Sequence, residues 1–133
     1  MGTDVRSRLR DERGASAVEF AFIVPLLLLL LLGIAEFGRA FQVQATLSAA
    51  AREGVRTMAL QDDRTAARAA VRQAAGSLDP AITDAQIAIP AVCAGRPVGS
   101  TVQLTITYPM PFLTDLFGTG LTLTGRGVMR CNG

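Results

Sequence analysis

The sequence predicts an α+β protein in which one long N-terminal helix carries an apolar run and then continues into a small head. An uncharged run, residues 20–35, follows an arginine-rich start. Apolar residues then recur every three or four positions to about residue 60, a spacing typical of a helix. After residue 80 the period changes to two, which predicts a second region of about three antiparallel strands.

The apolar run is long enough to cross a membrane only together with the residues before it. Residues 20–35 give about 24 Å of helix, whereas residues 15–35 are enough to span a hydrocarbon core of about 30 Å. We therefore expect a transmembrane helix over 15–35, which places Glu19 inside it or at the interface. An ionised carboxylate at mid-membrane costs about 2.5 to 3.5 kcal/mol, so Glu19 must be neutralised, hydrated or paired with a charged partner. Pro25 also lies in the run and is expected to bend the helix.

Cleavage of the chain after Gly14 would provide that partner. The new terminus, Ala15, would carry an ammonium group one helical turn before Glu19 and on the same face. The two charges would pair within one subunit or between neighbours. One alternative is a secretory signal peptide cut after Ala35, because a basic start, a short apolar core and small residues at 33 and 35 also fit that pattern. Another is an anchored envelope protein that is never cleaved.

The basic residues predict how the chain is oriented in the membrane. Only Arg39 follows the run closely, whereas four arginines precede it: Arg6, Arg8, Arg10 and Arg13. The excess of positive charge marks the cytoplasmic side. We therefore expect residues 1–14 to be a cytoplasmic leader, 36–60 to continue the long helix, and 61–133 to form an extracytoplasmic α+β head.

The part of the long helix beyond the membrane has an apolar stripe that predicts a core face. Its members are spaced by three or four: Val43, Leu47, Ala50, Gly54 and Met58. Phe37 and Phe41 are expected to form a second ridge beside it. A second helix is predicted over 64–75, capped by Asp62 or Asp63 and closed by Gly76. On another face it carries a basic row, either solvated or facing anionic headgroups: Arg64, Arg68 and Arg72.

Alternating residues predict the strands. The clearest strand covers 102–108, and we expect the prolines at 109 and 111 to end it. Another strand is expected around Ile87 and Ile89, and a third over 121–124. Residues 128–131 are a candidate extension of the third strand. A short apolar loop or helical turn is expected around 112–117.

Cys93 and Cys131 both fall outside the membrane in this topology. A bridge between them would close a loop worth about 3 to 4 kcal/mol, and an oxidising compartment permits it. Two unpaired thiols are the alternative.

The composition argues against an enzyme. The chain has no histidine, only two cysteines and a net charge of +2. It also lacks a phosphate loop and a nucleophile elbow. We therefore expect no catalytic residue, no metal, no cofactor, no nucleic acid and no small-molecule substrate.

The junction resembles a known signature. The segment Arg-Gly-Ala-Ser-Ala-Val-Glu-Phe-Ala-Phe-Ile-Val-Pro-Leu-Leu, residues 13–27, resembles the start of TadE-like proteins. These are minor pilins or pseudopilins of the Tad, or Flp-type, tight-adherence pilus and secretion system. The resemblance continues through residues 33–41 and 50–56. Phe20 replaces the tyrosine of the major Flp pilins, which also lack so long a head, and this favours an accessory subunit.

The resemblance implies a pilin-like fold and a place in the bacterial inner membrane. It implies that a prepilin peptidase cuts between Gly14 and Ala15, and that Glu19 guides assembly. The implied partners are this peptidase, other pilins and the Tad assembly proteins. The resemblance does not decide between TadE and its relatives TadF and TadG, or between a subunit in the fibre and one that stays in the membrane.

Overall fold

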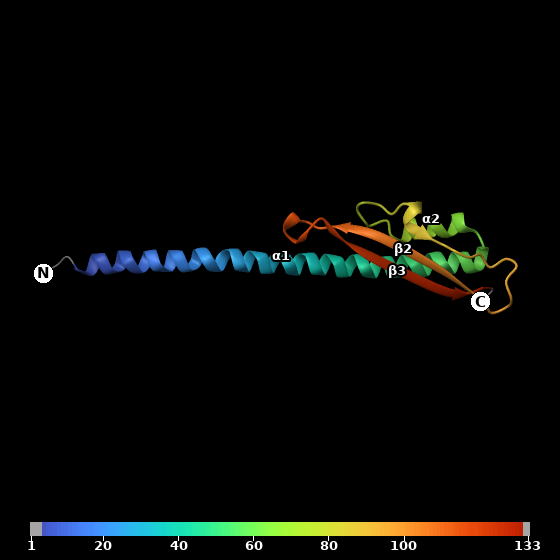
Figure 1. Cartoon of the computed structure of the whole chain (residues 1–133), viewed down its shortest axis with the longest axis horizontal. Helices are drawn as coiled ribbons and strands as arrows, with labels where there is room; N and C mark the ends of the chain where they lie inside the picture. The colour runs from blue at the N-terminus through green and yellow to red at the C-terminus, as the bar shows by residue number, and fades with distance from the viewer. Residues whose placement is uncertain (1–3, 132–133) are drawn as a thin grey trace. The chain divides into compact units, whose positions relative to one another are not determined.

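The structure is a computed structural model that describes the backbone of residues 4–131 and the side chains of residues 14–131. The described residues form two α-helices and a three-stranded sheet, and Figure 1 labels α1, α2, β2 and β3 among them. The elements are α1 (Asp4–Gln61), α2 (Arg64–Ala74), η1 (Asp84–Gln86), β1 (Ile87–Ala88), β2 (Thr101–Pro111), η2 (Asp115–Phe117) and β3 (Gly120–Arg130). The predicted α+β fold with a long N-terminal helix is therefore confirmed.

The contacts divide the chain into two compact units, Met1–Gly38 and Arg39–Gly133. Unit 1 is the N-terminal part of α1, and unit 2 contains the rest of α1 with α2 and the sheet. Helix α1 ends one residue past the predicted limit, but it begins at Asp4 rather than at residue 15. The four leader arginines lie before residue 14, so their side chains are not among those that the structure describes.

The apolar stripe of α1 forms the core of unit 2, as predicted. Every member of the stripe is buried, and Leu47, Ala50 and Met58 are fully so. The expected second ridge is not a packing surface, because the Phe37 and Phe41 side chains are 80% and 76% exposed. The stripe therefore accounts for the packing of α1, whereas these phenylalanines face outward.

Helix α2 packs against α1 through one glycine. Asp63 is its N-cap and accepts hydrogen bonds from the backbone N–H groups of Thr65 and Ala66. A Cβ on Gly54 of α1 would lie 2.4 Å from a methyl carbon of Val71 in α2. The absence of a side chain at Gly54 thus lets the two helices approach closely.

The sheet has the order β1-β2-β3 with antiparallel pairing throughout. Strand β1 is shorter than expected and pairs only Ile87 with Ile106 and Ala88 with Thr105. The expectation that prolines end β2 was wrong, because the strand continues through Pro109 and Pro111. Proline is tolerated in a strand where its nitrogen faces an open edge. Past its two pairs with β1, β2 has such an edge.

Two glycines allow β3 to lie directly on α1. Residues 128–130 extend the strand predicted over 121–124, as the candidate extension proposed, and the single strand includes Gly125 and Gly127. A Cβ on Gly125 would lie 2.5 Å from the carbonyl oxygen of Leu47, and one on Gly127 would lie 2.4 Å from that of Ala51. Both glycines are buried, so the strand backbone packs against the helix backbone.

Tyr108 reports on this core. It is the only tyrosine of the chain, its side chain is 1% exposed, and its hydroxyl donates to the Pro80 carbonyl oxygen at 2.8 Å. Burial raises the pKa of Tyr108 above its ordinary value of 10.0, while Arg39 lowers it and Asp79 raises it by smaller amounts.

We expect unit 2 to lose stability at alkaline pH through Tyr108. Because the folded state holds the proton more tightly, this contribution is complete below pH 10.0 and is lost as pH rises through the higher folded pKa. The absorbance of tyrosinate should therefore appear at a higher pH in the folded full chain than in the same chain unfolded in urea. A single titration curve common to both conditions would contradict the expectation. Tyr108→Phe, the control, should remove this absorbance change and lower stability by about 1 kcal/mol through the lost hydrogen bond.

Candidate functional site

The predicted processing junction lies within α1. Gly14 and Ala15 are both helical and exposed. A Cβ added to Gly14 would have open space around it. Apart from its two chain neighbours and the backbone of its own helix, no described atom would lie within 4 Å. Nothing in the described part of the chain therefore covers the peptide bond between Gly14 and Ala15.

Glu19 lies one helical turn after Ala15 and is exposed. Residues four apart on a helix share a face, so Glu19 and Ala15 lie on the same side of α1. Among residues 14–131, no basic side chain forms an ion pair with Glu19. The carboxylate thus has no partner charge within the described side chains.

The apolar side chains that follow Glu19 are exposed, as expected of a segment that lies in a membrane. Large side chains on all sides of the helix are exposed, from Phe20 (69%) and Phe22 (77%) to Ile34 (62%). One helix of the described chain is long and apolar enough to cross a membrane, with a mean hydropathy of 2.6 over its most apolar window. None of that window is buried within the chain. Pro25 lies inside α1 without interrupting the helix.

A comparison with protein families finds a match that covers the predicted junction, Glu19 and the apolar run. The model of the family described as "TadE-like protein" matches residues 14–56. Over these residues, which we call the TadE-like segment, the chain is similar to TadE-like proteins. The match begins at Gly14, contains Glu19 and Pro25, and ends in the part of α1 that forms the core of unit 2. No curated protein and no solved structure matches the chain.

The match confirms the resemblance that the junction predicted. The similarity covers the most apolar part of the one described helix that is long and apolar enough to cross a membrane. The segment ends before α2 and the sheet, so residues 57–133 lie beyond it. The features of that remainder come from the structure alone.

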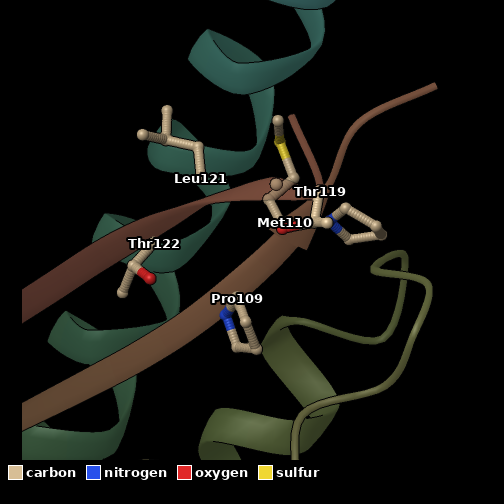
Figure 2. Close-up of a pocket in the computed structure, with 7 residues that line it drawn as sticks. Pro109, Met110, Thr119, Leu121 and Thr122 are labelled. Atoms are coloured by element: carbon tan, nitrogen blue, oxygen red, sulfur yellow. The ribbon is translucent and has the colours of Figure 1, made fainter. Parts of the chain in front are cut away.

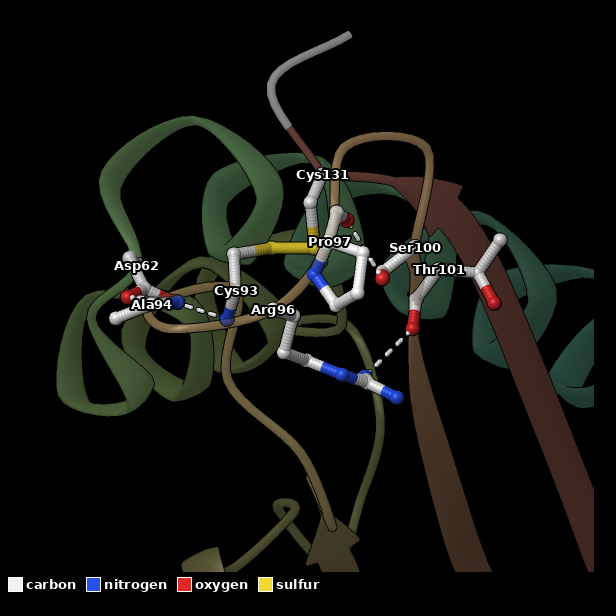
Figure 3. The surroundings of a disulfide bond; sticks show 8 residues. All are labelled: Asp62, Cys93, Ala94, Arg96, Pro97, Ser100, Thr101 and Cys131. Atoms are coloured by element: carbon white, nitrogen blue, oxygen red, sulfur yellow. Dashed lines mark hydrogen bonds between the residues drawn. A yellow bond between two sulfur atoms is a disulfide. The ribbon is translucent and has the colours of Figure 1, made fainter.

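The two cysteines lie outside the TadE-like segment and form a disulfide (Figure 3). The Cys93 and Cys131 Cα atoms are 5.5 Å apart, and 38 positions separate the two residues in sequence. The bond joins the end of β3 to the loop after β1. Because a crosslink over so long a loop restricts the unfolded chain, it adds about 4 kcal/mol of stability on the chain-entropy model.

Asp62 holds the same loop, and sequence reasoning missed this role. It was a candidate cap for α2, but Asp63 is the cap. Asp62 instead has a left-handed backbone, with φ at 52°, and its carboxylate accepts the N–H groups of Cys93 (2.5 Å) and Ala94 (2.8 Å). The sequence signal was the pair of aspartates, which allows one to cap the helix and the other to reach elsewhere.

The predicted basic row of α2 is not a set of three free cations. Arg72 pairs with Asp84 of η1, and the Arg68 side chain is partly buried. Arg64 is exposed at the start of the helix. The charge of Arg72 is therefore offset by its ion pair and Arg68 is partly covered, which weakens the row as a surface for anionic headgroups.

Proposed function

We propose that this chain is a minor pilin or pseudopilin-like membrane protein that serves the assembly of a Tad (Flp, type IV-like) pilus or secretion apparatus. The observation that carries the proposal is the extent of the TadE-like match. It begins at the glycine before the predicted cut and covers the whole apolar run. One continuous helix, α1, contains all of it.

In this proposal a prepilin peptidase removes residues 1–14 at the cytoplasmic face. The exposure of Gly14 and Ala15 supports it, because the bond to be cut has no neighbouring side chain over it. Cleavage gives Ala15 an ammonium group one turn from Glu19. That group is a charge partner which the described side chains do not supply.

Residues 15–35 then hold the subunit in the bacterial inner membrane, with the N-terminus in the cytoplasm and unit 2 outside. The four leader arginines favour this orientation. The Cys93–Cys131 disulfide also supports it, because such bonds persist in oxidising compartments. Glu19 sets the register of neighbouring subunits through their N-termini.

We propose that the protein works through interactions and catalyses no reaction. It has no histidine, and its carboxylates are scattered along the chain. Its partners are the prepilin peptidase, other pilins and Tad assembly proteins. We propose no cofactor, no nucleic acid and no small-molecule substrate.

Sequencing the N-terminus of the membrane-bound protein tests the proposal. We expect the mature chain to begin at Ala15. A chain that begins at Glu36 would instead be a secreted domain released by signal peptidase, and one that begins at Met1 would be an uncleaved anchored protein. Either result would contradict the processing step.

Gly14 substitutions sharpen that test. We expect Gly14→Ala to slow processing and Gly14→Trp to abolish it, because the bulky side chain would stand at the bond that the peptidase must reach. Gel shift and N-terminal sequencing measure the processed fraction. Gly38→Trp is a matched control, since Gly38 is also an exposed glycine of α1 with open space around it. Normal maturation of Gly14→Trp would refute the site.

A further inference from the structure

The turn between β2 and β3 carries apolar side chains that unit 2 does not bury. Leu113 is 59% exposed, Leu116 66% and Phe117 45%. Phe112 packs against the core and anchors the start of the turn. Residues 112–119 contain one charged residue, Asp115, and no basic residue. An exposed apolar cluster of this kind indicates a contact surface.

The register of β3 on α1 determines where this turn lies within unit 2. Gly127 lies over Ala51 and Gly125 over Leu47. The Gln44 amide donates to the Thr124 carbonyl oxygen at 2.9 Å. Lower residue numbers in β3 thus meet lower residue numbers in α1, and the β2–β3 turn points to the end of unit 2 that begins with Arg39.

A hydrogen bond fixes the base of the turn at that end. The Arg39 guanidinium donates to the Pro111 carbonyl oxygen at 2.8 Å. Next to it, Figure 2 shows the paired residues at the base of the hairpin, among them Met110 and Leu121. The Leu121 side chain is itself 45% exposed. The Phe41 side chain, two residues after Arg39 in α1, is 76% exposed.

Arg39 follows Ala35, the last residue of the apolar run, by four positions. Four residues span at most about 14 Å even when fully extended, so this limit holds however the two units are arranged. The headgroup regions add about 5 to 8 Å to each side of the hydrocarbon core. If residues 15–35 span the membrane, Arg39 therefore lies in the headgroup region or at most about 6 to 9 Å beyond it, a gap that the eight-residue turn 112–119 is long enough to cover.

We propose that the β2–β3 turn, residues 112–119, is a second membrane contact that inserts its leucines and Phe117 into the outer interface of the bilayer. The proposal rests on the membrane-spanning role proposed for α1. Continuity with that segment favours lipid as the occupant. Of the eight large apolar side chains exposed in the described part of unit 2, five lie at this end: Phe41, Leu113, Leu116, Phe117 and Leu121. Because the turn has no basic residue, its insertion is apolar and insensitive to salt.

Tryptophan fluorescence tests the proposal, since the chain contains no tryptophan. We would place Leu116→Trp in the full chain, reconstituted in phosphatidylcholine vesicles whose acyl chains carry bromine near the headgroup or near the chain end. We expect a blue-shifted emission that loses most of its intensity to the shallow bromines, with little change in high salt. Phe117→Trp is a second probe at the same turn, in case the first variant does not fold.

Two control positions make the outcomes distinct. Val98→Trp lies at a fully exposed site beside the other end of β2, about 33 Å along the strand, and should stay unquenched. Leu28→Trp lies in the apolar run and should be quenched by the deep bromines. Quenching of Leu28→Trp without quenching at the turn would overturn the inference and leave the proposed function intact. No quenching at Leu28→Trp would overturn the membrane-spanning role and the inference with it.

Contact of the turn with protein instead of lipid would give a third pattern. The emission of Leu116→Trp would then be blue-shifted but unquenched by bromine, and it would change with the protein-to-lipid ratio. A second copy of the chain would produce this pattern in vesicles that contain only this protein. That result would overturn the lipid assignment.

Discussion

Replacing Gly127 with alanine is expected to destabilise unit 2 by about 3 kcal/mol, the upper end of the usual cost of overpacking a core. The new Cβ would lie 2.4 Å from the Ala51 carbonyl oxygen and 2.9 Å from a methyl carbon of Val55. The Ala51 oxygen belongs to the backbone of α1 and cannot turn away as a side chain does. Either β3 must lift from the helix or the helix must shift. For a domain that is stable by about 5 to 15 kcal/mol, this is a large loss.

Urea unfolding of the full chain in detergent measures the effect. Near-ultraviolet circular dichroism of Tyr108 reports on unit 2, because this buried side chain is the only tyrosine and there is no tryptophan. Gly38→Ala is the matched control: its Cβ meets nothing within 4 Å in α1, and the change should leave stability equal or raise it by up to about 1 kcal/mol. Equal unfolding free energies for Gly127→Ala and the unaltered chain would mean that β3 does not lie directly on α1.

The sequence predicted the features that depend on local spacing. The stripe from Val43 to Met58 repeats with the period of a helix, and its burial requires only that something packs on that face. The alternation of Val102, Leu104 and Ile106 likewise determines which face of β2 is buried. Gly14, Ala15 and Glu19 could be named as candidate site residues because all three lie within two turns of one helix, so their spacing in sequence gives their spacing in the structure.

The features that sequence reasoning missed depend on what lies across from a residue. Pro109 fits into β2 because β1 ends early and leaves an edge open, which its own neighbours in sequence do not reveal. The sequence allowed the third strand to continue past Gly125 and Gly127, but it did not reveal that both glycines lie against the backbone of α1. Asp62 and Asp63 are adjacent and chemically alike, so only the position of the Cys93 loop separates their roles.

Glu19→Ala is expected to leave membrane insertion intact, or to improve it, while assembly fails. An ionised carboxylate in the membrane costs about 2.5 to 3.5 kcal/mol on insertion scales, so its removal favours the inserted state. The same change leaves the Ala15 ammonium of the processed chain without its partner. Loss of one member of a buried ion pair costs about 3 to 5 kcal/mol. Three kcal/mol corresponds to a loss of about a hundredfold in association.

The charge of Glu19, rather than its size, carries this effect, and two further variants separate the two properties. Glu19→Gln keeps the shape and a hydrogen-bonding group but removes the charge, so it should assemble as poorly as Glu19→Ala. Glu19→Asp keeps the charge on a shorter side chain and should recover part of the assembly. Carbonate extraction measures insertion, N-terminal sequencing confirms that Ala15 is exposed in each variant, and recovery of pili or of copurified pilins measures assembly. Since the described side chains offer Glu19 no cation, the processed N-terminus is the partner that the proposal requires. Wild-type assembly by Glu19→Gln would show that the carboxylate acts without pairing.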